Sequence, residues 1–151
     1  MLPIKKILWP TDFSDASYKA LGAAKELASR FSAELWVLHV VQLNAAAGAG
    51  VLLSLDLPKY EKELMMSAKK SIDQVIKQRV GEKYQVQERV IIGAPAEGIA
   101  QIAAEEKIDI IVIATHGESA FHHFVFGSVA EKVIRLASCP VLVIRAQQKE
   151  D

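Results

Sequence analysis

Five apolar runs alternate with four stretches of helical periodicity along the chain. The runs are rich in β-branched residues, which is typical of strands buried on both faces. In the helical stretches, apolar residues recur every three or four positions and charged residues lie between them. The predicted strands are Ile4–Trp9, Leu35–Val41, Gln85–Ile92, Ile108–Ala114 and Val141–Ile144. The predicted helices begin after Ser14, near Tyr60, at Pro95 and at Ser128.

This alternation predicts an α/β domain. Connections between parallel strands through a helix are right-handed, so we expect a five-stranded parallel sheet with four helices in a three-layer α/β/α, Rossmann-like fold. The domain is expected to span residues 1–146, followed by a polar tail over 147–151. The third strand has a polar first half and is predicted to lie at a sheet edge. The segment Leu43–Pro58 has no clear periodicity and is interpreted as a long loop.

Composition limits the classes of partner. The chain has 151 residues, of which 24% are charged, and its formal net charge is zero. A general electrostatic affinity for nucleic acid or an anionic membrane is therefore not expected. No apolar run is long enough to span a membrane, and the N-terminus lacks a signal-peptide pattern. The single cysteine, Cys139, excludes an internal disulfide, so we expect a cytoplasmic protein in which this residue has a packing role.

Polar or glycine-containing loops follow three of the predicted strands. These loops are Pro10–Asp12, His39–Val41 and Ala114–Gly117. In open parallel sheets, ligands bind at this carboxyl edge, where the strand order reverses. Further along, Gly127 and Ser128 begin a helix, whose first N–H groups and dipole favour an anion. An ordinary helix cap explains the same two residues equally well.

Two other nucleotide or hydrolase motifs are incomplete. The run Gly93–Gly98 has the glycine spacing of a P-loop, but no lysine and hydroxyl residue follow it. The run Gly117–Phe121 resembles a nucleophile elbow around Ser119. Its catalytic histidine would have to come later in the chain, and no histidine follows His123. A P-loop is therefore excluded, and a hydrolase remains a distant alternative.

A cluster of histidines invites a metal site. The cluster consists of His116, His122, His123 and Glu118. Its spacing matches no compact zinc pattern, and adjacent histidines point to different sides of a backbone. Loop histidines exposed to solvent are the simpler interpretation, so no metal ligand is predicted among them.

With these residues assembled, the chain resembles the universal stress protein family. The family pattern after the fourth strand is Gly-x-x-Gly, nine residues, and then Gly-Ser or Gly-Thr. Gly117, nine intervening residues and Gly127-Ser128 match it, with Ala114 in place of the first glycine. Other segments that resemble the family are Pro10–Asp12, Leu38–Val41, Gly93–Pro95 and Cys139–Ile144.

The resemblance implies that ATP binds at the carboxyl edge of the sheet, with Mg²⁺ or Mn²⁺ offsetting the phosphate charge. It implies that Pro10, Thr11 and Asp12 contact the ribose or adenine side and that Val40 meets adenine through its backbone. The residues implied to line the phosphate path are Ala114, Gly117, Gly127, Ser128 and Val129. The resemblance also implies a homodimer, which an open apolar edge at Val141–Ile144 favours.

Two functions stay open on the sequence. The first is a stress-response or signalling module that binds ATP and hydrolyses it slowly at most, since no base or cation is obviously aimed at the phosphates. The second is a dimeric interaction protein of the same fold that binds no nucleotide. Ala114, Glu118 and the bulky run Phe121–Phe124 favour the second, because they depart from the family pattern. Glu118 in particular would repel a triphosphate.

Overall fold

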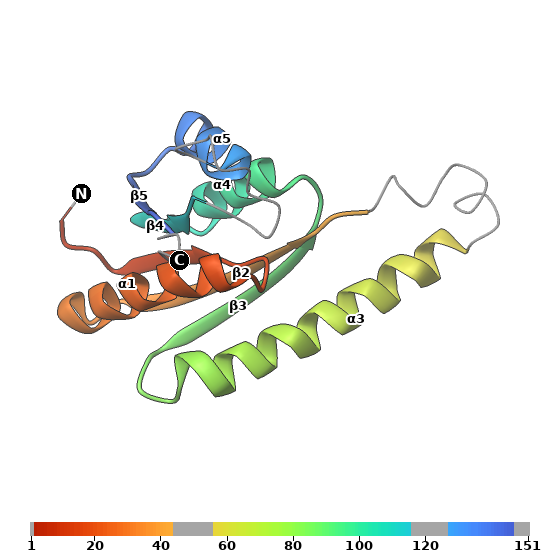
Figure 1. Ribbon diagram of the computed structural model, residues 1–151, viewed down its shortest axis with the longest axis horizontal. Coiled ribbons are helices and arrows are strands. Elements are labelled where there is room, and N and C mark those ends of the chain that lie inside the picture. Colours follow the sequence, from red (N-terminus) through yellow and green to blue (C-terminus); the bar gives the residue numbers. More distant parts are fainter. Residues whose placement is uncertain (1, 44–55, 116–126, 147–151) are drawn as a thin grey trace, which may run out of the picture.

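The computed structural model describes residues 2–43, 56–115 and 127–146, and these ranges contain the predicted alternation of strands and helices (Figure 1). The strands are β1 (Lys6–Pro10), β2 (Glu34–Val41), β3 (Val86–Ile92), β4 (Ile110–Ala114) and β5 (Val141–Ile144). The helices are α1 (Asp15–Phe31), α3 (Leu57–Val75), α4 (Pro95–Glu105) and α5 (Ser128–Leu136), and the π-helical turn η2 (Ile76–Val80) continues α3. None of the helices in these ranges is long and apolar enough to cross a membrane.

The strands form one parallel sheet in the order β3-β2-β1-β4-β5, which confirms the predicted five-stranded sheet. Alternate side chains of the central strands point to opposite faces. Ile7 and Trp9 of β1 pack with α1 and α3, whereas Leu8 packs with α4 and α5. All three side chains are completely buried. Figure 1 shows the two helix pairs on opposite sides of the sheet, so the predicted three-layer arrangement is confirmed.

The edges of the sheet are β3 and β5. The edge position predicted for the third strand from its polar first half is therefore confirmed. Arg89 of β3 makes a 2.9 Å ion pair with Glu106, and its guanidinium lies 5.1 Å from the centre of the Trp36 ring. Burial, together with nearby Asp73 of α3, raises the pKa of Glu88 above its ordinary value. Polar side chains of β3 thus contact helices on both faces of the sheet.

Helix α3 begins earlier than the sequence predicts. The sequence predicts a loop up to Pro58, but the helix begins at Leu57. Asp56 caps it by accepting a hydrogen bond from the Lys59 N–H at 3.3 Å, and Pro58 suits the first turn because no N–H is needed there. At the far end, Gly81 stops the π-helical turn with a φ of 86°, a conformation that glycine adopts without a steric penalty. The part of the predicted loop between residues 44 and 55 lies outside the described residues.

Cys139 lies just before β5 and packs against the core shared by α4 and α5. Burial is the largest cause that raises the pKa of its thiol above the ordinary value. A thiol with a raised pKa is largely protonated at neutral pH and therefore a weak nucleophile. This agrees with the packing role expected for the residue.

Candidate functional site

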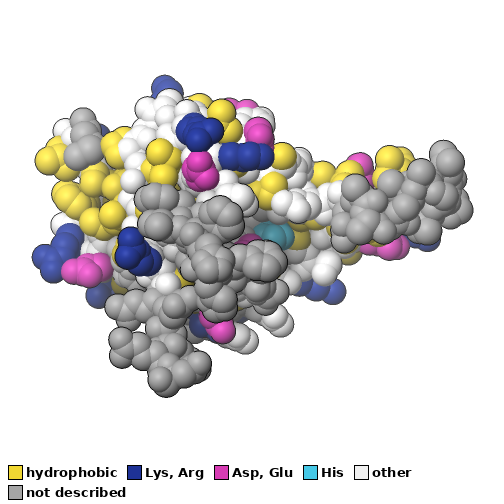
Figure 2. Space-filling model, turned by 45° about the horizontal axis from the view of Figure 1, so that its top comes forward, with side chains coloured by type: hydrophobic (Ala, Val, Ile, Leu, Met, Phe, Trp, Pro, Cys, Tyr) yellow, Lys and Arg dark blue, Asp and Glu magenta, His cyan; other side chains and the backbone are white. Residues whose placement is uncertain are grey.

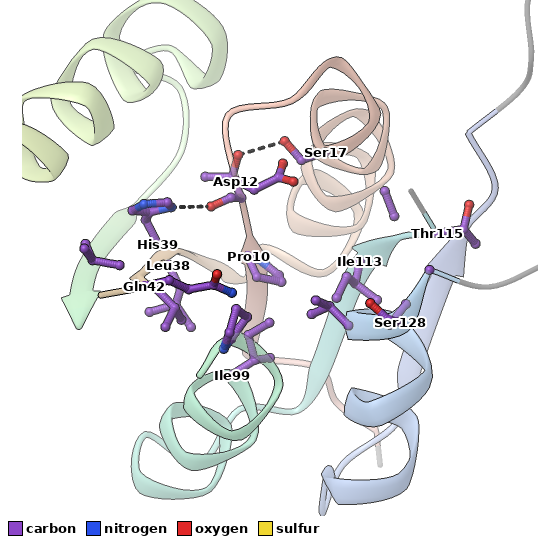
Figure 3. Close-up of a pocket in the computed structure, with 18 residues that line it drawn as sticks. Pro10, Asp12, Ser17, Leu38, His39, Gln42, Ile99, Ile113, Thr115 and Ser128 are labelled. Atoms are coloured by element: carbon purple, nitrogen blue, oxygen red, sulfur yellow. Dashed lines mark hydrogen bonds between the residues drawn. The ribbon is translucent and has the colours of Figure 1, made fainter. Parts of the chain in front are cut away.

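A cavity of about 740 Å³ opens at the carboxyl ends of β1, β2 and β4 (Figure 3). The chain builds the sheet outward from β1 to β3 and then crosses back to place β4 beside β1, so the cavity lies where the strand order reverses. The N-termini of α4 and α5 border it. Its volume is within the roughly 300–1,000 Å³ typical of small-molecule sites. The predicted convergence at this edge is confirmed for the loops Pro10–Asp12 and His39–Val41 and for residues 114–115, while the rest of the third loop lies outside the described residues.

The cavity has room because β1 and β4 separate before either strand ends. Their ladder pairs Ile7 with Ile110 and Leu8 with Ile111, whereas β1 stays paired with β2 as far as Pro10. Backbone groups alternate sides along a strand. Since the next residue, Thr11, directs its N–H to β2, the backbone of Pro10 is turned towards β4. Proline has no N–H to donate, so Pro10 ends the ladder and leaves space between the two strands.

Hydrogen bonds among its own side chains hold the loop after β1. Thr11 is buried, and its Oγ1 accepts a hydrogen bond from the Phe13 N–H at 3.0 Å and pairs with Ser17 Oγ at 2.8 Å. Asp12 Oδ1 accepts hydrogen bonds from both the N–H and the hydroxyl of Ser14, the residue that caps α1. The Thr11 side chain therefore builds the loop, while Asp12 is exposed and presents its carboxylate at the cavity.

His39 of β2 makes a second connection to this loop. Its Nδ1 donates to the carbonyl oxygen of Thr11 at 2.7 Å (Figure 3). The His39 ring also lies 4.4 Å from the ring of Phe13, measured between centroids. Because the partner is a carbonyl, the Nδ1 must carry the proton. The imidazole thus fastens the end of β1 to the end of β2.

Helix α4 packs closely on β2 and β3 through Gly98. A Cβ atom at this position would lie 2.9 Å from Ile91 Cδ1 and 3.1 Å from Val40 Cγ2. A methyl group here would require the Ile91 and Val40 side chains to shift, so glycine allows the helix its closest approach to the sheet. It brings Pro95 and Ile99 of α4 to the cavity, where together with Val40 they form an apolar wall.

The helices differ in how their N-termini are capped. Ser14 caps α1 and Asp56 caps α3, each by accepting a hydrogen bond from an N–H three residues later. No side chain within the three described ranges caps α4 or α5, whose capping positions are held by Ala94 and Gly127. Both of these uncapped N-termini border the cavity. Their first N–H groups and dipoles together favour an anionic ligand.

The end of β4 is fixed to β5 by Thr115. Its N–H donates to the Ile144 carbonyl oxygen at 3.0 Å, and its Oγ1 accepts from the Ala146 N–H at 3.3 Å. Ala114, which stands where the family pattern has glycine, packs against the core of the α1 face. The fold therefore accommodates its methyl group at the end of the strand.

The structure brings the predicted site residues together. Those that line the cavity are Pro10, Thr11, Asp12, Val40, Ala114, Gly127, Ser128 and Val129. Gly117 lies outside the described residues, as do Ser119, Glu118 and the histidine cluster. Lining residues that were not predicted to bind a ligand include Ser17, Gln42, Pro95, Ile99 and Thr115. Gln42 belongs to no motif, and Thr115 occupies a variable position of the Gly-x-x-Gly pattern, so only the position of each directly after a predicted strand could have identified them.

The cavity holds few charges of its own. Among the described residues that line it, Asp12 and His39 are the only titratable side chains, and there is no lysine or arginine. No group of three or more metal-ligating side chains occurs in the described ranges. A metal ion here would depend on oxygens of the ligand, on water and on Asp12, which suits Mg²⁺ because it keeps several waters and takes few protein ligands. The backbone N–H groups supply most of the attraction for an anion.

Comparison with known proteins identifies the family. Residues 3–145 match the model of the universal stress protein family. The chain is 35% identical over 151 residues to universal stress protein MJ0531 of Methanocaldococcus jannaschii, across 97% of this chain and 85% of that protein. The solved structure of MJ0577 from the same organism is similar with a TM-score of 0.81 and 29% identity, over 97% of this chain and 99% of that one. A universal stress protein solved in complex with cAMP shares the fold, with a TM-score of 0.60, 24% identity and coverage of 94% and 97%. On the family match and the similarity to MJ0531, this chain belongs to the universal stress protein family.

Proposed function

We propose that this protein binds ATP in the cavity and acts as a nucleotide-dependent module of the stress response in the cytoplasm. The observation that carries the proposal is the different chemistry of the two ends of the cavity. One end is an apolar wall of β2 and α4, and the other is the uncapped N-terminus of α5. An apolar wall suits a flat base, and an uncapped helix N-terminus suits phosphate oxygens. The fold itself holds an adenine nucleotide in the family member solved with cAMP.

The base end of the proposed site is the wall of Val40, Pro95 and Ile99. The base packs between these side chains, and the backbone N–H and carbonyl of Val40 pair with its polar edge. Asp12, which lies at the same end with Pro10 and Thr11, accepts hydrogen bonds from the ribose hydroxyls. The hydrogen bonds that fix this loop support the assignment, because an ordered acceptor costs less entropy on binding.

The phosphate end of the proposed site is the start of α5. Gly127 has no side chain to block the approach, and the N–H groups of Ser128 and Val129 belong to the first turn of the helix. Ala114 also lines the phosphate end, and the family pattern assigns Gly117 to the same end. Since no lysine or arginine lines the described cavity, Mg²⁺ or Mn²⁺ bound to phosphate oxygens and water would neutralise the remaining charge.

The same residues favour binding over catalysis. Of the two titratable side chains at the described cavity, His39 is hydrogen-bonded to the Thr11 carbonyl and Asp12 to Ser14. Phosphoryl transfer needs a group that orients the attacking water and a cation directed at the transferred phosphate. We therefore assign the protein no efficient enzymatic activity and at most slow hydrolysis of ATP.

Two measurements on the purified protein test the proposal. Mass spectrometry of the small molecules released on denaturation should detect ATP or ADP, and calorimetric titration with ATP and Mg²⁺ should give saturable binding with one ATP per chain. The matched controls are GTP and tripolyphosphate. A folded protein that releases no nucleotide and gives no heat with ATP contradicts the proposal and supports the second function, an interaction protein of the same fold.

We also propose a homodimer that pairs through Val141–Ile144. This strand is at the sheet edge, and its Leu142 is 37% exposed. Figure 2 shows hydrophobic side chains gathered on the side of the molecule where Figure 1 places β5. An apolar edge with unpaired backbone groups favours pairing with a second copy. Analytical ultracentrifugation should find a dimer, and Leu142→Lys should shift it to monomer. A dimer unchanged by this substitution would show that the interface does not involve Val141–Ile144.

A further inference from the structure

The ladder between β1 and β2 ends one hydrogen bond earlier than its geometry allows. Its last pair is Pro10 with Leu38, and the Thr11 N–H then donates to the Leu38 carbonyl at 2.8 Å. In a parallel ladder, a residue that donates to one partner accepts from the residue two places further along. The next hydrogen bond would therefore run from the Val40 N–H to the Thr11 carbonyl. Instead, His39 Nδ1 donates to that carbonyl at 2.7 Å.

The backbone of Val40 is left without this partner. The Leu38 carbonyl faces β1, and the Val41 carbonyl faces β3, where it accepts from the Gly93 N–H at 3.0 Å. By alternation along the strand, the N–H and carbonyl of Val40 face the β1 side, beyond the last rung. Across the described ranges, the Val40 N–H donates to no other backbone group. Val40 lines the cavity, so one donor and one acceptor are available to a ligand there.

The position of the imidazole is itself well determined. Its ring contacts Phe13, whose φ of 64° is uncommon for a bulky residue. The Phe13 N–H donates to Thr11 Oγ1, and Thr11 in turn pairs with Ser17. Contacts from β2 and from the loop therefore hold the ring on the Thr11 carbonyl (Figure 3). A conformation of this kind persists only where the surrounding contacts fix it.

We propose that His39 is a positioning residue for the base of the nucleotide. Its imidazole donates a hydrogen bond to the Thr11 carbonyl, and the ladder between β1 and β2 therefore ends before Val40. The backbone N–H and carbonyl of Val40 stay free for the base. This inference rests on the proposed function, since it names how the same site keeps its base-recognising groups exposed. An adenine edge offers an acceptor beside an amino donor, which matches this pair, whereas guanine offers the reverse order. Backbone groups cannot rotate to suit both, unlike a side-chain amide, so the pair selects adenine for a base whose orientation is set by the ribose and phosphate contacts.

The test compares His39→Leu with His39→Asn. Leucine removes the donor, whereas the side-chain amide of asparagine places an N–H near the position of Nδ1 and can keep the hydrogen bond to Thr11. The first readout is hydrogen exchange of the Val40 amide in the full chain without nucleotide. We expect fast exchange in the original protein and in His39→Asn, and exchange at least about tenfold slower in His39→Leu, where the N–H can reach the Thr11 carbonyl.

The second readout is calorimetric affinity for adenosine and for ATP. Both should weaken about tenfold or more in His39→Leu and less than about threefold in His39→Asn, consistent with the loss of base hydrogen bonds. Unchanged Val40 exchange in His39→Leu overturns the inference, and so does equal affinity for adenosine in all three proteins. If the original protein binds neither adenosine nor ATP, the proposed function fails, while the exchange comparison still decides the role of His39.

Discussion

At the β1–β2 end of the cavity the polar side chains are held by hydrogen bonds within the protein, whereas at the β4–α5 end the helix N–H groups have no side-chain cap. Thr11, Asp12 and His39 all make hydrogen bonds within the first end. Gly127, in the capping position of α5, has no side chain to offer the second end. Under the proposed function, ordered side chains surround the base, and the phosphates meet helix N–H groups that no side chain caps.

The two ends should affect the free energy of binding in different ways. Ordered side chains at the β1–β2 end lower the entropy lost when a ligand binds there. A helix capped by glycine forgoes a few tenths of a kcal/mol relative to one capped by a polar side chain, and a bound anion can stabilise its first N–H groups. The uncapped N-terminus of α5 therefore predicts that a bound nucleotide raises the unfolding free energy as well as filling the cavity.

The largest effect is expected at the open end, for Gly127→Val. The φ of −64° and ψ of 150° at this position suit any residue, so the backbone is not strained. The new side chain separates the phosphates from the N–H groups of α5, and contacts to charged oxygens contribute about 1.5–3 kcal/mol each. Calorimetry should show ATP binding about 100-fold weaker, with adenosine affinity nearly unchanged. Gly127→Ala is the milder control, and full ATP affinity in Gly127→Val would place the phosphates elsewhere.

The next effect concerns the apolar wall at the other end. In Gly98→Ala the added Cβ would lie 2.9 Å from Ile91 Cδ1 and 3.1 Å from Val40 Cγ2, so both side chains must shift, and this cost opposes the gain of about 0.5–1 kcal/mol from helix propensity. Gly22 in α1 is the matched control, because a Cβ there has no atom within 4 Å. Gly22→Ala should stabilise by about 0.5–1 kcal/mol through helix propensity. Urea denaturation should thus find Gly98→Ala less stable than Gly22→Ala, and an equal gain in both would contradict close packing of α4 on β2.

A smaller effect is expected for Asp12→Asn. The amide oxygen can still accept from Ser14, so the loop is kept while the negative charge is lost. Affinity for adenosine and affinity for ATP should each fall by about 1 kcal/mol, because an amide oxygen accepts from the ribose hydroxyls less strongly than a carboxylate does. Asp15→Asn, in the first turn of α1 and outside the cavity lining, is the control. An unchanged affinity for adenosine would remove Asp12 as a partner of the ribose.

The smallest effect lies away from both ends, at Glu88. Its raised pKa means that the folded state holds the proton more tightly than the unfolded state. The protonated Glu88 therefore contributes stability that is fully present below the ordinary glutamate pKa and is lost as pH rises through the raised pKa of the folded state. Glu88→Gln should therefore stabilise the protein at neutral pH by up to about 0.5 kcal/mol. The value is small because water screens the repulsion between Glu88 and Asp73, and the gain should vanish in acid. Urea titrations at neutral and at acidic pH, with Glu82→Gln as control, check the sign of the stability change. The affinity for ATP should not change.

Much of the fold could be predicted from local pattern. The apolar runs gave all five strands, and the polar half of Gln85–Ile92 gave an edge, because burial on two faces requires continuous apolar sequence. The start of α3 was missed, since Asp56 and Pro58 act as a helix start only when the turn that follows is helical. The π-helical turn at Ile76–Val80 has no periodic signal of its own.

The site could be predicted where a residue follows a strand within a family motif, as Asp12 and Gly127 do. The contacts that shape the inside of the site could not be predicted. The separation of β1 from β4 at Pro10 depends on which neighbour the proline faces, and the role of His39 depends on the position of the Thr11 carbonyl. Both are properties of strand register, which a single sequence does not display.

The most direct test of the account is an NMR titration of the ¹⁵N-labelled protein. With ATP and Mg²⁺, the backbone amides of Val40 and Val129, which lie at opposite ends of the cavity, should shift together and saturate at one ATP per chain. Adenosine should shift Val40 alone, and tripolyphosphate should shift Val129 alone. Saturable ATP binding that leaves both amides unshifted, or no response to ATP at all, would contradict a site with its base at β2 and its phosphates at α5.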